Sequence, residues 1–252
     1  MKSILITGAG SGIGKATAEL FYRGGWFVGV LDIAMQPLDQ LTAGWDSSRF
    51  FASTADVTKP DQISAALDAF FTRANSLDVL FNCAGVLEIG DFEAIPLARH
   101  QQILEINNKG VLNCCYLALP YLKKSTGARV ISMSSASSLY GVPGFASYSA
   151  SKFWVKGFTE ALSAEWSRHG IMVMDIEPPF VKTPMLEGKQ AKIIERMGVN
   201  LKAEDIAAEV MRAANDTEIH HPVSAQYKLL RHMRKLLPDA ATRLLMKTMS
   251  GY

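Results

Sequence analysis

Tyr148 and Lys152, four residues apart, are the side chains with the clearest capacity for chemistry in this sequence. A helix places residues at this spacing on one face. A phenol with a pKa of about 10 is a poor base at neutral pH, but a neighbouring ammonium favours the phenolate. Ser135 follows an apolar run and could hydrogen-bond a substrate oxygen. An exposed helical pair is the alternative, and in an arbitrary protein it is the commoner one.

A glycine-rich segment near the start of the chain offers a second kind of chemistry. An apolar run at residues 4–6 leads into this segment, and a helical pattern begins at Lys15. Backbone N–H groups without Cβ atoms in the way can bind a diphosphate, and the dipole of a following helix adds attraction. An ordinary flexible turn is the alternative. The pattern predicts a dinucleotide site, with these candidate contacts: Gly8, Ser11, Gly12, Ile13 and Gly14.

Asp32 ends the next apolar run, residues 26–31, eighteen residues beyond Gly14. A carboxylate at this point can accept hydrogen bonds from the adenosine ribose and repel a 2′-phosphate. The sequence therefore favours NAD over NADP. Two alternatives remain, because Lys15 could contact an extra phosphate and Asp32 could cap the following helix.

The elements that position these residues alternate along the chain. Apolar strands are expected at 49–53, 77–81, 128–133 and 171–176, and helices at 15–23, 37–42, 61–73, 97–124 and 146–168. Alternation of this kind requires a parallel sheet with helices on both faces. We expect a single-domain doubly wound α/β Rossmann fold of about seven strands over residues 1–252. Further candidate contacts follow the third and fourth strands, where open sheets bind ligands: Asp56, Val57, Asn82, Ala84 and Gly85.

Composition indicates a globular protein, which we expect to be cytoplasmic. The chain has 252 residues, 48% of them hydrophobic, and a formal net charge of +2, which gives no reason to expect nucleic acid. The cysteines Cys83, Cys114 and Cys115 form no C-x-x-C motif, so we expect a reducing compartment and no metal site. The glycine segment begins too early for a cleaved signal, and no apolar run approaches the length of a membrane span.

Taken together, these motifs resemble the classical short-chain dehydrogenase/reductase family over residues 1 to about 184. The resemblance implies an NAD(P)-dependent oxidoreductase acting on CH–OH groups. It also implies a homodimer or homotetramer built on the helix that contains Asn107 and the helix that follows Tyr148. The matching residues beyond the glycine segment are Asp56-Val57, Asn82-x-Ala84-Gly85, Asn107, Ser135, Tyr148-x-x-x-Lys152 and Pro178-x-x-Val181-x-Thr183.

The same resemblance implies roles for individual residues. Tyr148 is the general acid/base, and Ser135 polarises the substrate oxygen. Lys152 lowers the tyrosine pKa and bonds the nicotinamide ribose, while Asn107 holds a water that relays protons to Lys152. Asn107 is chosen over Asn108 because the family's asparagine stands three residues before a glycine, here Gly110. Cofactor contacts are further implied for Tyr148, Lys152, Pro178, Val181 and Thr183.

Three features depart from the family pattern. Cys83 stands where an asparagine is usual, and Pro179 where a glycine is usual, which fixes φ and removes an N–H. The third is a basic tail, residues 226–252, with six Lys and Arg against Asp239 alone. Its apolar residues recur every three to four positions, and Pro238 is expected to kink or split the helix. Packing on its own subunit or a partner is the favoured interpretation, and contact with an anionic membrane surface is the less favoured one.

The expected substrate is an apolar or lipid-like alcohol or ketone, because apolar residues are expected to surround Ser135 and Tyr148. Residues 184–200 are the expected lid over the substrate. His220 and His221 are expected to be structural. The rival interpretation is a non-catalytic NAD-sensing or scaffold protein of the same fold. The expected lining residues are Val86, Leu87, Leu139, Val142, Phe145, Phe180, Met185 and Leu186.

Overall fold

Seven parallel strands form the central sheet of the computed structural model, which describes the whole chain except the side chain of Lys235. The strand order is β3-β2-β1-β4-β5-β6-β9. The strands β2 and β3 therefore extend the sheet on one side of β1, and the later strands extend it on the other side. This order confirms the predicted doubly wound Rossmann fold. The strands are β1 (Ser3–Thr7), β2 (Phe27–Asp32), β3 (Phe50–Thr54), β4 (Val79–Asn82), β5 (Arg129–Met133), β6 (Met172–Glu177) and β9 (His220–Pro222).

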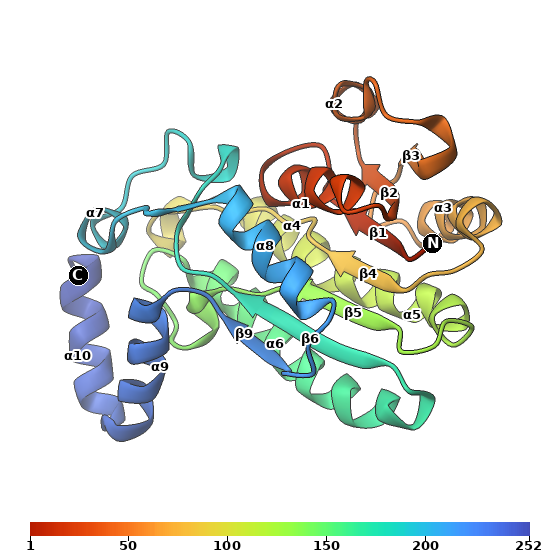
Figure 1. Ribbon diagram of the computed structural model, residues 1–252. Helices are drawn as coiled ribbons and strands as arrows, with labels where there is room; N and C mark the ends of the chain where they lie inside the picture. Colours follow the sequence, from red (N-terminus) through yellow and green to blue (C-terminus); the bar gives the residue numbers. More distant parts are fainter.

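Helices cover both faces of this sheet (Figure 1). Every residue of β1 is buried, because neighbouring strands and helices enclose it on all sides. Leu5 faces one hydrophobic cluster, while Ile4 and Ile6 face the other. On the first face lie α3 (Pro60–Ala74), α5 (Gly110–Leu122) and α6 (Ala146–Trp166), and on the second lie α1 (Gly12–Arg23), α2 (Met35–Thr42) and α8 (Ala203–Ala213).

The expected helix over 97–124 consists of three parts. It comprises α4 (Leu97–Leu104), a π-helical turn at Glu105–Lys109, and α5. Such wide turns insert one residue into the helical ladder and frequently occur at functional sites. Here the turn carries Asn107. Short 3-10 turns occur at Ser47–Arg49, Phe92–Ala94, Ala136–Ser138, Ser167–His169 and Pro184–Leu186.

The segment expected to be a lid is bracketed by a small parallel pair, β7 (Val181–Lys182) and β8 (Leu201–Lys202). Between them lies α7 (Lys192–Met197). The two short strands hold the ends of the segment together at the carboxyl edge of the main sheet. The segment therefore leaves and rejoins the domain at one place.

The basic tail forms a helical hairpin, which we call the C-terminal hairpin, of α9 (Ala225–Leu236) and α10 (Asp239–Ser250). The helix splits at Pro238, as predicted. Figure 1 shows the two helices side by side next to α7. The hairpin packs on its own subunit through buried Tyr227 and Thr242, whereas Leu229 and Leu236 remain exposed.

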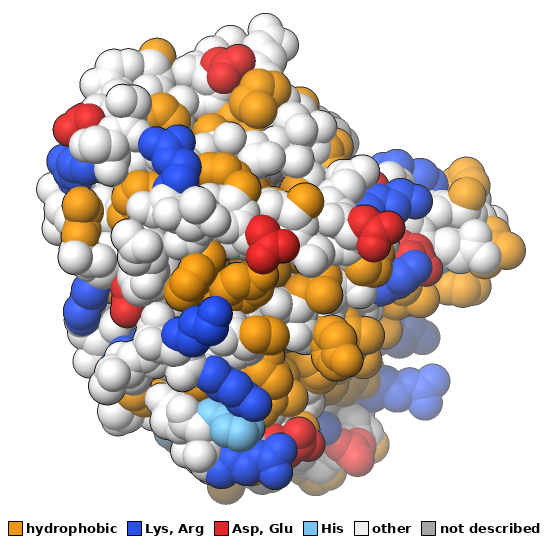
Figure 2. Space-filling view, turned by 90° about the vertical axis from the view of Figure 1, so that its right-hand side faces the viewer, with side chains coloured by type: hydrophobic (Ala, Val, Ile, Leu, Met, Phe, Trp, Pro, Cys, Tyr) orange, Lys and Arg blue, Asp and Glu red, His pale blue; other side chains and the backbone are white. Residues whose placement is uncertain are grey.

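Charged side chains are mixed on the face at the amino ends of the strands. Figure 2 shows Lys and Arg interspersed there with Asp and Glu, in keeping with the small net charge. Each helix in the described part of the chain is too short or too polar to cross a membrane.

Candidate active site

The glycine turn between β1 and α1 has no room for side chains at two of its positions. Gly8 has φ +68°, and a Cβ there would lie 2.7 Å from the Ala84 Cα. A Cβ on Gly14 would lie 2.1 Å from the Gly8 carbonyl oxygen, well inside van der Waals contact. The turn therefore requires glycine at both positions, and it presents backbone at the N-terminus of α1.

Asp32 is fixed at the edge of this turn. Its Oδ2 accepts a hydrogen bond from the Gly10 N–H at 2.8 Å, and its Oδ1 accepts one from the Ile33 N–H at 2.8 Å. Ala34, not Asp32, is the N-cap of α2, so the capping alternative is wrong. The carboxylate is thus oriented by backbone groups and faces the pocket described next.

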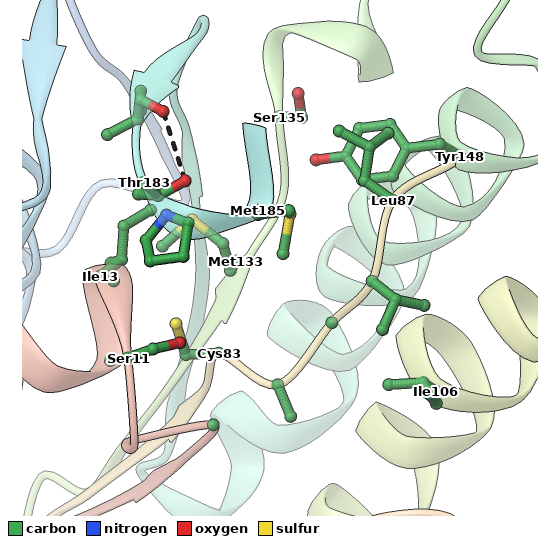
Figure 3. A pocket seen from close by; sticks show the side chains of 18 of the residues that line it. Ser11, Ile13, Cys83, Leu87, Ile106, Met133, Ser135, Tyr148, Thr183 and Met185 are labelled. Atoms are coloured by element: carbon green, nitrogen blue, oxygen red, sulfur yellow. Dashed lines mark hydrogen bonds between the residues drawn. The ribbon is translucent and has the colours of Figure 1, made fainter. Parts of the chain in front are cut away.

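A cavity of about 310 Å³, the main pocket, lies along the carboxyl edge of the sheet from the glycine turn to Tyr148 (Figure 3). It brings together most of the predicted site residues. These are Gly8, Ser11, Gly12, Ile13, Gly14, Asp32, Asp56, Val57, Ala84, Gly85, Ser135, Tyr148, Lys152, Pro178, Val181 and Thr183, with Val86, Leu87, Phe145, Phe180, Met185 and Leu186 of the expected substrate lining.

Ser135 and Tyr148 face each other at one end of the main pocket. Ser135 follows β5, and its Oγ accepts a hydrogen bond from the Ser137 N–H at 3.1 Å. That bond uses a lone pair of the serine oxygen and leaves its proton free to be donated. Figure 3 shows the Tyr148 hydroxyl turned toward Ser135. Two hydroxyl groups therefore converge where a substrate oxygen could accept hydrogen bonds from both.

Burial controls the protonation of Tyr148 and Lys152. It raises the pKa of Tyr148 to about 12, although the neighbouring Ser135 hydroxyl acts in the opposite direction. Burial also lowers the pKa of Lys152 to about 8. The Lys152 ammonium donates to the Met133 carbonyl at 2.7 Å and lies 5.5 Å from the centre of the Tyr148 ring. Burial is the largest effect on the Tyr148 pKa in the protein alone, and the expectation that Lys152 lowers this pKa stays a prediction.

Asn107 lies behind the wall of the main pocket. Its Oδ1 accepts from the Val86 N–H at 2.8 Å, and its Nδ2 donates to the Val86 carbonyl at 3.0 Å and to Ser151 Oγ at 3.1 Å. The side chain thus joins the loop after β4 to α6. Three hydrogen bonds to protein groups hold this amide in place, and the expected water relay from Asn107 to Lys152 stays a prediction.

Asn82 also differs from its expected role. It is 3% exposed, and its Nδ2 lies 3.2 Å from Ser132 Oγ and 3.4 Å from Cys115 Sγ. These contacts tie β4 to β5 and to α5 below the pocket. The Asn82 side chain therefore has structural contacts and does not line the main pocket, and the expected cofactor contact of this residue stays a prediction.

The sequence analysis did not identify Glu177, a fully buried carboxylate at the end of β6. Lys156 Nζ lies 2.7 Å from its Oε1, and the Tyr227 hydroxyl donates to its Oε2 at 3.3 Å. Ser138, beside Ser135, lies 3.4 Å from Oε1. The available signal was an acidic residue at the end of an apolar strand, but nothing local indicated that its partners come from α6 and α9.

The two histidines of β9 make structural contacts. His220 Nδ1 lies 2.9 Å from the buried Asp175 carboxylate, and His221 Nδ1 lies 2.9 Å from Glu209 Oε1. These pairs fasten the last strand of the sheet to β6 and α8. The expectation of a structural role agrees with these contacts.

Comparison with known proteins decides the family. The sequence model described as short chain dehydrogenase matches residues 2–193. The chain belongs to this family. A 3-oxoacyl-[acyl-carrier-protein] reductase of Thermotoga maritima is 32% identical over 223 residues, covering 85% of this chain and 91% of the relative. A cyclohexanol dehydrogenase of Acinetobacter sp. is 30% identical over 200 residues, covering 77% of this chain and 79% of the relative.

A solved structure of this family agrees with the fold. The 3-ketoacyl-(acyl-carrier-protein) reductase of Brucella melitensis, complexed with NADH, is 26% identical with a TM-score of 0.80, covering 88% of this chain and 96% of the relative. Short-chain dehydrogenases bind a nicotinamide cofactor, and the residues present here fit one. The glycine turn offers backbone donors for a diphosphate, and Tyr148 and Lys152 stand at the other end of the same pocket.

Proposed function

We propose that this protein is an NAD-dependent oxidoreductase that interconverts an alcohol and its ketone, with an apolar or lipid-like substrate. One observation carries the proposal. The hydroxyl groups of Ser135 and Tyr148 and the buried Lys152 stand at one end of the pocket that begins at the glycine turn and Asp32.

Each catalytic residue has a role that fits its surroundings. Ser135 donates its free hydroxyl proton to the substrate oxygen. Tyr148 gives a proton to that oxygen in ketone reduction and takes it back in alcohol oxidation. Lys152 supplies positive charge near the phenol and hydrogen-bond donors for the nicotinamide ribose. The nicotinamide, when bound, supplies or accepts the hydride. Asn107 is a positioning residue that holds the loop after β4 in place.

The preference for NAD rests on Asp32. Its carboxylate lines the pocket and is held by two backbone N–H groups, so it offers acceptors to ribose hydroxyls and repels a 2′-phosphate. Lys15 is exposed on α1 and does not line the main pocket, and its contact with an extra phosphate is the alternative that would favour NADP. Asp56 and Val57 at one end, and Pro178, Val181 and Thr183 at the other, complete the proposed cofactor contacts.

The proposed substrate class rests on the walls around Ser135 and Tyr148. Leu87, Phe145 and Phe180 face this end of the pocket, and Met185 and Leu186 belong to the proposed lid. The names of the relatives include a cyclohexanol dehydrogenase and a reductase of 3-oxoacyl groups, both acting on a carbon that bears oxygen beside apolar carbon.

A turnover panel tests the proposal. Apolar ketones and alcohols, with small polar sugars for comparison, are assayed with NAD(H) and NADP(H) in parallel, and binding of both cofactors is titrated. Activity confined to polar sugars, or tighter binding of NADP, would contradict the respective part of the proposal.

The Tyr148→Phe variant tests the catalytic assignment. It removes one hydroxyl and retains the ring, so turnover should fall by about 10³-fold or more while NAD binding is largely retained. Ser147→Ala, one residue away on α6, is the control and should keep most activity. Unchanged turnover in Tyr148→Phe would exclude tyrosine as the acid/base. Unchanged biological activity would favour a sensor.

We further propose a cytoplasmic homodimer or homotetramer joined through α5 and α6. The outer sides of these helices expose large apolar side chains. Apolar groups gathered on adjacent helices are typical of an interface between subunits. The exposed residues are Leu112, Tyr116, Phe153 and Trp154.

A further inference from the structure

A second, mostly apolar cavity of about 80 Å³, the hairpin chamber, adjoins the main pocket. Both cavities are lined by Ser135, Ser137, Pro179 and Phe180. The chamber therefore begins beside the serine assigned to the substrate oxygen and leads away from the glycine turn. A substituent on the reacting carbon would meet the chamber directly.

The walls of the hairpin chamber come from the two segments that lie over the carboxyl edge of the sheet. The proposed lid contributes Ile193 and Met197. The C-terminal hairpin contributes Leu230 and Met233 from α9 and Leu245 and Met246 from α10. All these side chains are apolar and unbranched at Cβ except isoleucine, and methionines adapt to ligands of varied shape.

The hairpin walls belong to a part of the chain outside the family match. That match ends at residue 193, whereas the hairpin spans Ala225–Ser250. The lining at the junction includes Pro179, which replaces the usual glycine and adds an apolar ring between the two cavities. Part of the chamber wall thus comes from a segment that the family model does not describe.

Buried polar contacts fix the hairpin against the site. Tyr227 of α9 is 1% exposed and lines the chamber, and its hydroxyl donates to Glu177. Arg231 Nη1 lies 3.5 Å from the same carboxylate. On the other side, Met246 and Met249 pack against the cluster that contains Ile193. These contacts fix the position of the chamber walls relative to Ser135.

We propose that the hairpin chamber binds the aliphatic chain of the substrate, and that the C-terminal hairpin selects substrates by chain length. The inference rests on the proposed function, because it places the reacting carbon between Ser135 and Tyr148. The ligand class is an unbranched alkyl ketone or the corresponding secondary alcohol. An apolar chain is favoured there because the chamber offers it carbon surface in place of water.

A homologous series of methyl ketones tests this inference. Each methylene that enters the chamber should raise kcat/KM about fourfold, which corresponds to about 0.8 kcal/mol, until the chamber is full. The Leu230→Trp variant fills the chamber and should abolish this gain. The rate with the shortest reactive ketone serves as the reference within each variant, so that the test compares only the dependence of kcat/KM on chain length.

The matched control is Leu229→Trp. Leu229 is the preceding residue on α9 and is 62% exposed, so the same bulk is added outside the chamber. This control should retain the wild-type dependence on chain length. Met246→Ala enlarges the chamber and should move the optimum of kcat/KM toward longer chains. This variant tests the inference if Leu230→Trp fails to fold.

The outcomes separate this inference from the proposed function. A flat chain-length profile in a wild-type enzyme that reduces short ketones would overturn the inference alone. Equal effects of Leu229→Trp and Leu230→Trp, or no movement of the optimum in Met246→Ala, would do the same. Failure of every ketone and alcohol with either cofactor would instead overturn the proposed function.

Discussion

At the scale of single residues, burial sets the chemistry of the site. The same loss of hydration raises the pKa of Tyr148 to about 12 and lowers that of Lys152 to about 8, because burial disfavours the charged form of either group. At neutral pH both groups hold their protons. This state suits donation of a proton to a ketone oxygen. Of the two groups, Lys152 has the pKa that is nearer to neutral pH.

The pH dependence of ketone reduction follows from these two values. Above about pH 8, Lys152 loses its proton and its charge, and the rate should fall by about tenfold per pH unit. Tyr148 stays protonated until about pH 12, so it does not limit this range. Initial rates measured from pH 6 to pH 10 with saturating reduced cofactor check the expectation.

The Lys152→Arg variant tests whether loss of the Lys152 charge causes the decline in rate above about pH 8. A guanidinium remains charged throughout this range, so the variant should be slower overall but should lose the decline near pH 8. A wild-type rate that stays level up to pH 10 would contradict the assignment, as would a decline at the same pH in Lys152→Arg.

At the scale of elements, contacts of Glu209 join the last strand of the sheet to the helix before it. Glu209 of α8 contacts Arg212 of the same helix and His221 of β9. Burial acts to raise the Glu209 pKa, but hydrogen bonds from His221 and Arg212 outweigh it and hold the pKa at about 2. A carboxylate with a lowered pKa stabilises the fold at neutral pH and loses this contribution as pH falls.

Glu209→Gln should therefore lower the free energy of unfolding by about 1–2 kcal/mol at pH 7. This figure already includes a reduction for solvent screening, because the carboxylate is partly exposed. The difference should shrink as pH falls from the ordinary value of 4.5 toward about 2, because the wild-type group then takes up a proton. Urea unfolding at pH 7 and pH 3 measures both effects.

The control for this prediction is Glu165→Gln. Glu165 is exposed on α6, and its replacement should change stability by less than about 0.5 kcal/mol at either pH. A loss in Glu209→Gln that is equal at pH 7 and pH 3 would show that the contribution is packing and not charge.

At the scale of the whole molecule, α5 and α6 expose large apolar side chains on their outer sides. Tyr116 is 75% exposed, and Phe153 and Trp154 are also accessible, although the other sides of both helices pack on the sheet. Water contact with this much aromatic surface is unfavourable. Association of two copies through these helices would remove it.

Tyr116→Arg should therefore dissociate the proposed oligomer. A charge at the centre of an apolar interface is costly to bury, so the subunit affinity should fall by about 100-fold or more. Sedimentation velocity across a concentration series measures the change. Leu236→Arg, at a side chain that is 85% exposed on α9, is the control. A wild-type protein that is monomeric throughout would contradict the proposed assembly.

The sequence alone determined the fold and the outline of the site. Strands and helices follow local periodicity, which depends on residues a few positions apart, and the glycine turn follows from local sterics. The ends of successive parallel strands meet at one edge, so Asp32, Asp56, Ser135 and Tyr148 could be placed around one pocket before the structure was known.

Only the tertiary structure decided the features that depend on burial and on distant partners. Asn82 turned inward, and desolvation raised the Tyr148 pKa although Lys152 lies nearby. Tyr227 meets Glu177 across fifty residues of chain, and this contact fixes a wall of the hairpin chamber. Local patterns give the faces of each helix, but which faces meet, and how dry the space between them is, results from packing the whole chain at once.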